Sequence, residues 1–220
     1  MITVWGRRSS VNVQKVLWAL GEAGVEFDRV TVGGSFGGLD TAEYKKINPM
    51  ALVPAIRDGT ITMAESHAIL RYLARRYGKG TLQPRGFRGL ALAEQWVEWT
   101  TSTFAPAIAP IFMNKIRKTP EEADEQAVKR AERASVAVLR LANRSLGRRP
   151  FVAGRAFSYG DIPLGAMYWR YKNLEIDRPP LPHLDRWFEA LQERPAYREW
   201  VMVPFGRNVA EWNAAEQELK

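Results

Sequence analysis

The hydrophobic pattern of the first 80 residues predicts short strands alternating with helices. Apolar residues recur at helical spacing between residues 12 and 23, whereas residues 27–32 alternate with the period of two that is typical of a strand. Asp58-Gly59 is a strong hairpin signal between two short apolar runs. The predicted elements are strands at 2–5, 27–32, 53–56 and 61–63, and helices at 12–23, 41–46 and from 65 to about 77. This βαβ-ββα order requires the first two strands to be parallel and the hairpin to be antiparallel.

From residue 87 onward the apolar spacing is helical throughout, which predicts an all-helical second half. A helix over about 87–115 should be broken or bent by Pro106 and Pro110, because proline lacks the N–H that a helix interior uses. Ser158 and Asp161 have the spacing of a capping box before an apolar helix. The remaining predicted features are a helix from 120–122 with a buried stripe, short helices near 184–191 and from 195, and a polar tail after 206. The stripe consists of Ala127, Ala131, Ala134, Val138 and Leu141.

Residues 79–86 read as the linker between these two halves. The sequence therefore predicts an α/β domain over residues 1–80 and an all-α domain over residues 87–220.

The composition narrows the chemistry. The 220 residues include no cysteine, which excludes disulfides, thiolate zinc sites and a cysteine nucleophile, and no metal-ligand cluster is evident. We expect a cytoplasmic, reducing environment. No apolar run reaches the about 18 residues of a membrane span. The net charge of +8 favours anionic ligands. Because no nucleic-acid recognition motif accompanies this charge, we predict neither a nucleic-acid nor a membrane partner.

Val53-Pro54, at the start of a predicted strand, is the first candidate for chemistry. A cis bond there would turn Val53 outward, so that its N–H and C=O could pair with an extended peptide lying alongside. The alternative is an ordinary strand start with a trans proline, which lacks the N–H that a strand ladder uses.

Two helix N-termini carry the other candidates. Glu65-Ser66 begin a helix, where free N–H groups and the helix dipole favour an anion. Ser66 could bond a carboxylate, and Glu65 could accept from an ammonium group. Ser10, with Asn12 just after it, could donate to a sulfur atom and favour the thiolate, since a free cysteine-type thiol has a pKa of about 8.5. Taken alone, each motif is better explained by helix capping.

The order of these motifs resembles the soluble glutathione transferases. The shared features are Asn48-Pro49, Val53-Pro54-Ala55-Ile56, Asp58-Gly59, Glu65-Ser66-His67-Ala68-Ile69 and, in the helical half, Ser158-x-x-Asp161. The resemblance covers about residues 2 to 205 and implies a thioredoxin-like N-terminal domain with glutathione as co-substrate. It implies that Ser10 is the catalytic hydroxyl of the serine-type (theta, delta, phi) classes. Asn12 matches an asparagine that faces the glutathione sulfur in nu-like bacterial members.

The resemblance also implies which residues hold glutathione. They are Leu52 and Val53 beside the cysteinyl backbone, Pro54 in the cis form, and Glu65 and Ser66 at the γ-glutamyl group. Many relatives carry a polar or basic side chain before the Val-Pro pair, but residues 50–52 are Met, Ala and Leu. The glycyl carboxylate therefore needs another partner, such as Lys45 or a backbone N–H of the loop 33–38.

The second substrate would lie against the helical domain. Candidate walls of its site are Phe36, Phe104, Ile108 and Phe112, for which core packing is the alternative. The predicted reaction is attack of the glutathione thiolate on a small, largely apolar electrophile. Glutathione-dependent peroxide or disulfide reduction and a non-catalytic binding module are the rival functions. The resemblance further implies a homodimer formed through the long helices after the linker.

Overall fold

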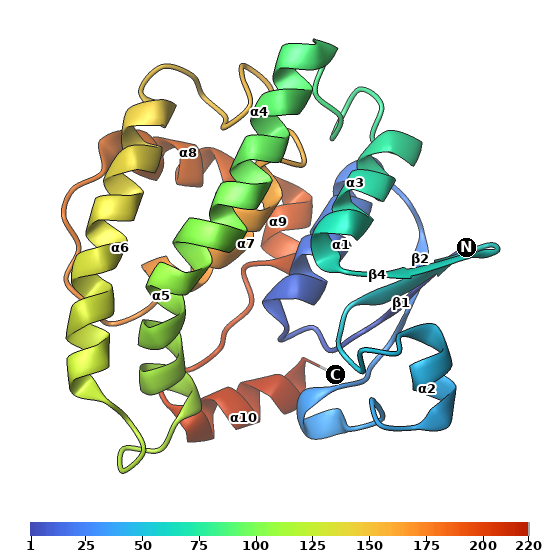
Figure 1. The fold of residues 1–220 in the computed structure, drawn as a ribbon, viewed down its shortest axis with the longest axis horizontal. Coiled ribbons are helices and arrows are strands. Elements are labelled where there is room, and N and C mark those ends of the chain that lie inside the picture. Colours follow the sequence, from blue (N-terminus) through green and yellow to red (C-terminus); the bar gives the residue numbers. More distant parts are fainter. Residues whose placement is uncertain (220) are drawn as a thin grey trace.

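A computed structural model describes residues 1–219 as a four-stranded sheet followed by a helical domain (Figure 1). Strands β1 (Ile2–Trp5), β2 (Phe27–Val30), β3 (Ala55–Asp58) and β4 (Ile61–Ala64) lie in the order β2-β1-β3-β4. β1 is parallel to β2 and antiparallel to β3, and β3 forms a hairpin with β4. The predicted βαβ-ββα order is confirmed, although β2 ends at Val30 and β3 begins only after Pro54.

The helices of this domain are α1 (Val11–Ala23), α2 (Ala42–Ile47) and α3 (Ser66–Arg76), with a 3₁₀ turn, η1, at Gly34–Phe36. α1 ends at Gly24, whose φ of 64° is the left-handed conformation that a helix C-cap needs. The Thr41 hydroxyl caps α2 by accepting a 3.2 Å bond from the Tyr44 N–H. α1 and α3 lie between the sheet and the helical domain (Figure 1).

The second half is all-helical, as predicted. Its elements are α4 (Gly86–Trp99), η2 (Thr100–Phe104), α5 (Ala105–Phe112), η3 (Met113–Arg117), α6 (Glu125–Leu146), α7 (Asp161–Lys172), α8 (Pro182–Gln192), α9 (Pro195–Trp200) and α10 (Val209–Glu218). α1 packs against α7 and α9 as well as α3. The division into residues 1–80 and 87–220 stays a prediction, because one continuous core crosses it.

The two prolines do not break the helical path between residues 86 and 117. η2 and η3 are π-helical turns on either side of α5, and Pro110 lies inside α5. Hydroxyl groups satisfy carbonyls of the preceding turn: Thr100 donates to Trp96 at 2.8 Å and Thr101 donates to Val97 at 3.1 Å. The widened turns and these side-chain bonds replace the regular ladder, so the helix is reshaped rather than ended.

α6 differs from its prediction in both start and buried face. It begins at Glu125, because the Asp124 carboxylate accepts a 2.9 Å bond from the Ala127 N–H. Ala131 is buried as predicted, but Ala134 and Leu141 are exposed. The buried stripe is Ala131, Ser135, Leu139, Ala142 and Leu146. It includes a serine whose hydroxyl donates to the Glu132 carbonyl at 2.8 Å, so a search for apolar residues alone misplaces the face.

The Ser158–Asp161 pair before α7 makes one half of the predicted capping box, because Asp161 accepts from the Ser158 N–H, although the N-cap residue is Gly160 and has no side-chain capping bond. The Asp161 carboxylate is completely buried and accepts from the Ser158 N–H at 3.0 Å, the Val152 N–H at 2.9 Å and the Trp187 indole N–H at 2.9 Å. These donors join the start of α7 to α8 and to the preceding loop.

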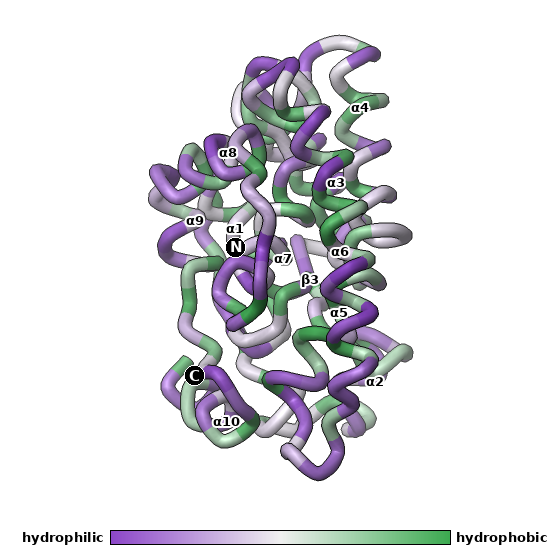
Figure 2. Tube along the Cα trace, turned by 90° about the vertical axis from the view of Figure 1, so that its left-hand side faces the viewer, coloured by the Kyte–Doolittle hydropathy of each residue, from purple (hydrophilic) through white to green (hydrophobic). Residues whose placement is uncertain are grey.

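The predicted polar tail after residue 206 is wrong: it contains the helix α10. The Asn208 side chain caps this helix by accepting from the Glu211 N–H at 3.0 Å. This helix contains both hydrophilic and hydrophobic residues (Figure 2). Trp212 and Glu216 are buried on one face, so α10 packs on the rest of the molecule rather than extending from it.

Candidate functional site

The register of the sheet brings the three candidate motifs to one end of it. Trp5, the last residue of β1, pairs with Ala55, the first of β3, and Ala55 pairs with Ala64, the last of β4. The loop after β1 leads to Ser10, the segment before β3 contains Val53-Pro54, and the segment after β4 is Glu65-Ser66. Segments far apart in sequence therefore meet at one end of the strands of the sheet.

The Val53–Pro54 peptide bond is cis, as predicted. The carbonyl of Leu52 accepts from the Tyr44 hydroxyl at 2.6 Å and from the Asn48 amide at 2.8 Å, which fixes the approach to this pair. Within the described residues 1–219, no hydrogen bond uses the backbone N–H or C=O of Val53. A half-exposed backbone with free polar groups suits the capture of an extended peptide.

Glu65 lies at the start of α3 with a φ of 67°, a conformation that few residues other than glycine adopt. Its side chain is exposed and makes no capping bond to α3. Ser66, the first residue of the helix, is buried apart from 8% of its surface. The exposed Glu65 carboxylate is therefore free of the helix, while the helix N-terminus itself favours an anion.

Ser10 precedes α1 as its N-cap. Its N–H donates to the Arg7 carbonyl at 3.1 Å and its C=O accepts from the Gln14 N–H at 2.9 Å, whereas its hydroxyl makes no capping bond. Asn12 is exposed in the first turn, and its side-chain oxygen accepts from Lys15 at 2.9 Å. With no acidic residue in the first turn, the end of α1 offers free donors and a positive dipole end to an anionic sulfur.

The predicted wall of the second-substrate site stays a prediction, and its four residues differ in exposure. Phe36 in η1 is half-buried. Phe104 is completely buried, with its ring stacked on Trp99 at 6.0 Å, so it belongs to the core in this conformation. Ile108 and Phe112 are 3% and 8% exposed, so neither forms an open surface. Apolar spacing cannot distinguish a cleft wall from a core face, because both require the same residues.

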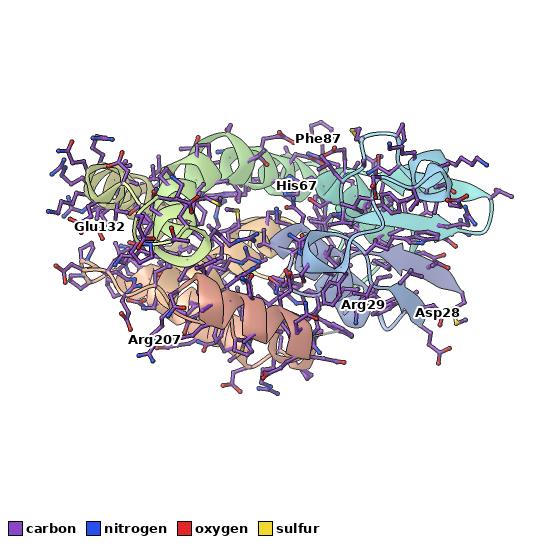
Figure 3. All side chains as sticks on the ribbon, turned by 90° about the horizontal axis from the view of Figure 1, so that it is seen from below. Asp28, Arg29, His67, Phe87, Glu132 and Arg207 are labelled. Atoms are coloured by element: carbon purple, nitrogen blue, oxygen red, sulfur yellow. The ribbon has the colours of Figure 1, made fainter. Side chains whose placement is uncertain are left out.

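A polar network that the sequence did not reveal joins the two domains. The Lys15 ammonium on α1 is 3.0 Å from Nε2 of His67 on α3, and Nδ1 of His67 is 3.0 Å from the hydroxyl of Thr101 in η2. Figure 3 shows His67 where the N-terminal domain meets the long green helix. Burial, followed by the charges of Lys15 and Arg71, lowers the pKa of His67 to about 3, so this imidazole is neutral at ordinary pH. The sequence could not predict this contact, because one histidine and one lysine that are 52 positions apart form no recognisable motif.

A second polar cluster links α10 to the β1–α1 loop. The carboxylate of Glu216 accepts from the Ser9 hydroxyl at 2.6 Å and pairs with Arg7 at 2.9 Å. It also accepts from the Ser35 hydroxyl, next to Phe36, at 2.5 Å. The C-terminal helix thus contacts both the β1–α1 loop, which leads to Ser10, and the η1 turn.

A cavity of about 1200 Å³ lies elsewhere, between residues 80–89, α4, the end of α6 and residues 153–157. Six arginines and no carboxylate line it, but none of the predicted site residues does. Among residues 1–219, no group of three or more His, Asp or Glu side chains could hold a metal ion. No helix in the same range is both long and apolar enough to cross a membrane.

The fold and the site define a two-domain protein of the thioredoxin-like class, with a cis-proline before β3 and an all-helical second domain. Two family models match the chain: the N-terminal domain of glutathione S-transferase over residues 9–76 and its C-terminal domain over residues 100–195.

Individual relatives agree with these matches. Glutathione S-transferase GstB of Escherichia coli (strain K12) is 36% identical over 206 residues, which are 93% of this chain and 99% of the relative. Glutathione S-transferase 3 of Zea mays is 31% identical over 91% of this chain and 93% of the relative. The crystal structure of the theta class glutathione S-transferase from Xanthomonas axonopodis pv. citri with glutathione bound is 41% identical, with a TM-score of 0.89 over 93% of this chain and 99% of that one. The chain belongs to the glutathione S-transferase family.

Proposed function

We propose that this protein activates the thiol of glutathione for attack on a small, largely apolar electrophile. The observation that carries the proposal is the meeting of the Ser10, Val53-Pro54 and Glu65-Ser66 segments at one end of the sheet. The bound glutathione in the similar Xanthomonas structure supports the same ligand for this chain.

Each segment would hold a different part of the tripeptide. The free N–H and C=O of Val53, beside Leu52 and the cis Pro54, would pair with the cysteinyl backbone. The Ser66 hydroxyl and the N-terminal N–H groups of α3 would bind the γ-glutamyl carboxylate. The exposed Glu65 carboxylate would accept from the γ-glutamyl ammonium.

The chemical step is a substitution or addition by sulfur. The Ser10 hydroxyl, our first choice, or the Asn12 amide would donate to the thiolate and so favour loss of the thiol proton to water. The sulfur then forms a bond to the electrophilic carbon. In a substitution the leaving group departs with its electron pair, and in an addition the displaced π electron pair takes up a proton from water. Proximity and charge stabilisation are the contributions of the protein.

The glycyl carboxylate is the part of glutathione without a predicted side-chain partner. Met50, Ala51 and Leu52 offer no polar side chain. Lys45 on α2 is exposed and is free of ion pairs within residues 1–219. Lys45 and the backbone N–H groups of the loop 33–38 therefore remain the proposed partners.

Calorimetry and paired assays test this function. Glutathione should bind with a dissociation constant below the millimolar range, and the complex should conjugate an activated aryl halide faster than it reduces an organic peroxide. Faster reduction would favour the reductase, in which glutathione itself must supply both thiols because the chain has no cysteine. No detectable binding at millimolar glutathione would favour a non-catalytic module.

We further propose a homodimer formed through α4 and α6, in a cytoplasmic setting that the cysteine-free sequence suits. Phe87 on α4 and Leu141 on α6 are 89% and 44% exposed, and the arginine-lined cavity lies between the same helices. An interface through these two helices would cover both apolar side chains. Sedimentation equilibrium of the wild type and of a Phe87→Glu, Leu141→Glu double variant would test it, because only the variant should be monomeric.

A further inference from the structure

Lys15 is a buried cation without a buried counter-charge. It lies on α1, one turn after Asn12, and is 4% exposed. Its ammonium contacts the Asn12 side-chain oxygen at 2.9 Å and the His67 ring at 3.0 Å. No carboxylate within residues 1–219 forms an ion pair with it. A buried charge that only neutral groups solvate is costly, which makes it a candidate for a functional role.

The direction of every hydrogen bond in this network follows from Lys15. In its charged form Lys15 can only donate, so the atom of Asn12 that faces it is the amide oxygen, and the nitrogen of His67 that faces it carries no proton. His67 therefore carries its proton on Nδ1 and donates to Thr101, which in turn donates to the Val97 carbonyl. The amide NH₂ of Asn12, by elimination, points away from Lys15 and has no partner among residues 1–219.

The charged and titratable groups that face Lys15 are His67 from α3 and Arg170 from α7. Burial, followed by the charge of Arg170, lowers the pKa of Lys15 from 10.5 to about 7. Arg170 itself donates to the Ser9 carbonyl at 2.5 Å, beside Ser10. Lys15 and Arg170 therefore place two cations beside the start of α1, where the positive end of the helix dipole also lies, and an anion bound there would stabilise the charged form of Lys15.

We propose that Lys15 is a positioning residue for the glutathione thiolate: it orients the Asn12 amide toward the sulfur and supplies the buried positive charge that favours the ionised thiol. The inference rests on the proposed function, because it takes bound glutathione as the anion. It adds to that function a residue that acts through Asn12 rather than by touching the substrate. By reciprocity, the thiolate must hold the proton on Lys15 as strongly as Lys15 favours the thiolate.

The test measures the pKa of the glutathione thiol bound to the full-length protein, from the ultraviolet absorbance of the thiolate as a function of pH. Lys15→Met removes the charge at similar length, Lys15→Arg retains it, and Lys129→Met removes an exposed lysine on α6 as the control. We expect Lys15→Met to raise the bound thiol pKa by about one unit, which lowers the thiolate fraction about tenfold at pH values below both pKa values. Lys15→Arg and the control should keep the wild-type value.

The rate provides a second readout that a merely structural role would not produce. The kcat/KM of Lys15→Met should fall about tenfold at pH values below both thiol pKa values and recover at alkaline pH, where the thiol ionises without help. An unchanged thiol pKa in Lys15→Met would overturn the proposal while leaving the proposed function intact. A wild-type protein that binds glutathione without lowering its thiol pKa would instead overturn both.

Asn12→Ala keeps the test valid if the buried substitutions prevent folding, since Asn12 is exposed. This variant should raise the bound thiol pKa in the same direction. Where Lys15→Met folds, the double variant should lose no more than the larger single change, because the two residues act as a unit. A wild-type thiol pKa in Asn12→Ala, or full additivity of the two changes, would contradict action through Asn12.

Discussion

The carboxylate of Glu216 accepts a 2.6 Å hydrogen bond from the hydroxyl of Ser9, although the two residues are 207 positions apart. Glu216 is 3% exposed, and it also binds Ser35 and Arg7. Figure 1 shows the C-terminal helix α10 reaching the N-terminal domain. Because Ser9 directly precedes Ser10, the last helix of the chain fixes the loop that presents the proposed catalytic hydroxyl.

Replacing Glu216 by Gln should weaken this contact in a pH-dependent way. Burial by itself raises the pKa of Glu216, but hydrogen bonds from Ser35 and Ser9 and the charge of Arg7 outweigh burial and leave the pKa below its ordinary value. A lowered carboxyl pKa stabilises the fold above the ordinary pKa, and this stabilisation is lost as the pH falls through the lowered value. We expect Glu216→Gln to lose about 2 kcal/mol of unfolding free energy at neutral pH.

Thermal unfolding of both proteins across the acid range measures this difference. The gap between wild type and variant should narrow at low pH, because the wild-type carboxyl is then protonated too. Glu218→Gln, an exposed change on the same helix, is the matched control and should leave the unfolding free energy unchanged. A gap that stays constant at all pH values would mean that the lost contacts do not depend on the charge of Glu216.

Glu65 is a site where stability and binding should oppose each other. A non-glycine residue at a φ of 67° costs on the order of 1–3 kcal/mol, and glycine adopts this conformation freely. We expect Glu65→Gly to raise the unfolding free energy by about 1 kcal/mol and to weaken glutathione binding at least tenfold.

Chemical denaturation and calorimetry measure the two effects separately. Glu65→Gln is the control, since it keeps the strained backbone and removes only the charge. It should leave stability near the wild-type value but lose most of the binding that Glu65→Gly loses. A glycine variant with full affinity would show that the carboxylate makes no contact with the ligand.

The sequence was sufficient to predict the order of strands and helices in the N-terminal domain, because the signals for these elements are local. Asp58-Gly59 specifies the hairpin and Gly24 specifies the end of α1, and each needs only its neighbours in the chain. α10 could not be predicted this way. Its buried residues, Trp212 and Glu216, contact partners more than 90 positions away, and a buried glutamate looks polar until its partners are known.

In the candidate site, too, features with local sequence signals could be predicted and long-range contacts could not. Motifs near the sheet ends could be predicted, because the strand order determines where they meet. The Lys15–His67–Thr101 network could not, since three polar residues on three separate helices share no spacing. The second-substrate wall stays a prediction for a related reason: Phe104 has the same apolar character in a cleft as in a core, and its burial alone does not distinguish the two.

Ser10→Ala tests the first choice for the thiolate donor. Loss of one donor to a developing or bound anion typically costs 10²–10³-fold in turnover when the anion is well desolvated. Because Ser10 lies at an accessible helix end, we expect a loss of about 10–100-fold in kcat/KM, with a raised thiol pKa and unchanged glutathione affinity at alkaline pH. Stopped-flow and binding measurements over pH check this. Full activity in Ser10→Ala, with activity lost in Asn12→Ala, would assign the role to Asn12.

Trp212 tests whether α10 limits the size of the second substrate. Its ring packs edge-on against Phe112 at 5.6 Å and lies under the Arg117 guanidinium at 4.4 Å, so it covers one of the predicted wall residues. Trp212→Leu should uncover Phe112 and cost about 3 kcal/mol of unfolding free energy. We expect kcat/KM for a bulky aryl electrophile to rise relative to that for a small one.

Trp200→Leu is the matched control for Trp212→Leu, because Trp200 packs on Phe27 of β2 and under Arg8 instead of on the predicted wall. It should lower stability without changing the ratio of the two kcat/KM values. Measuring that ratio, rather than either rate alone, removes the effect of a smaller folded fraction, which lowers both rates equally. The same ratio in both variants would mean that α10 does not border the second-substrate site and that its packing on Phe112 serves stability alone.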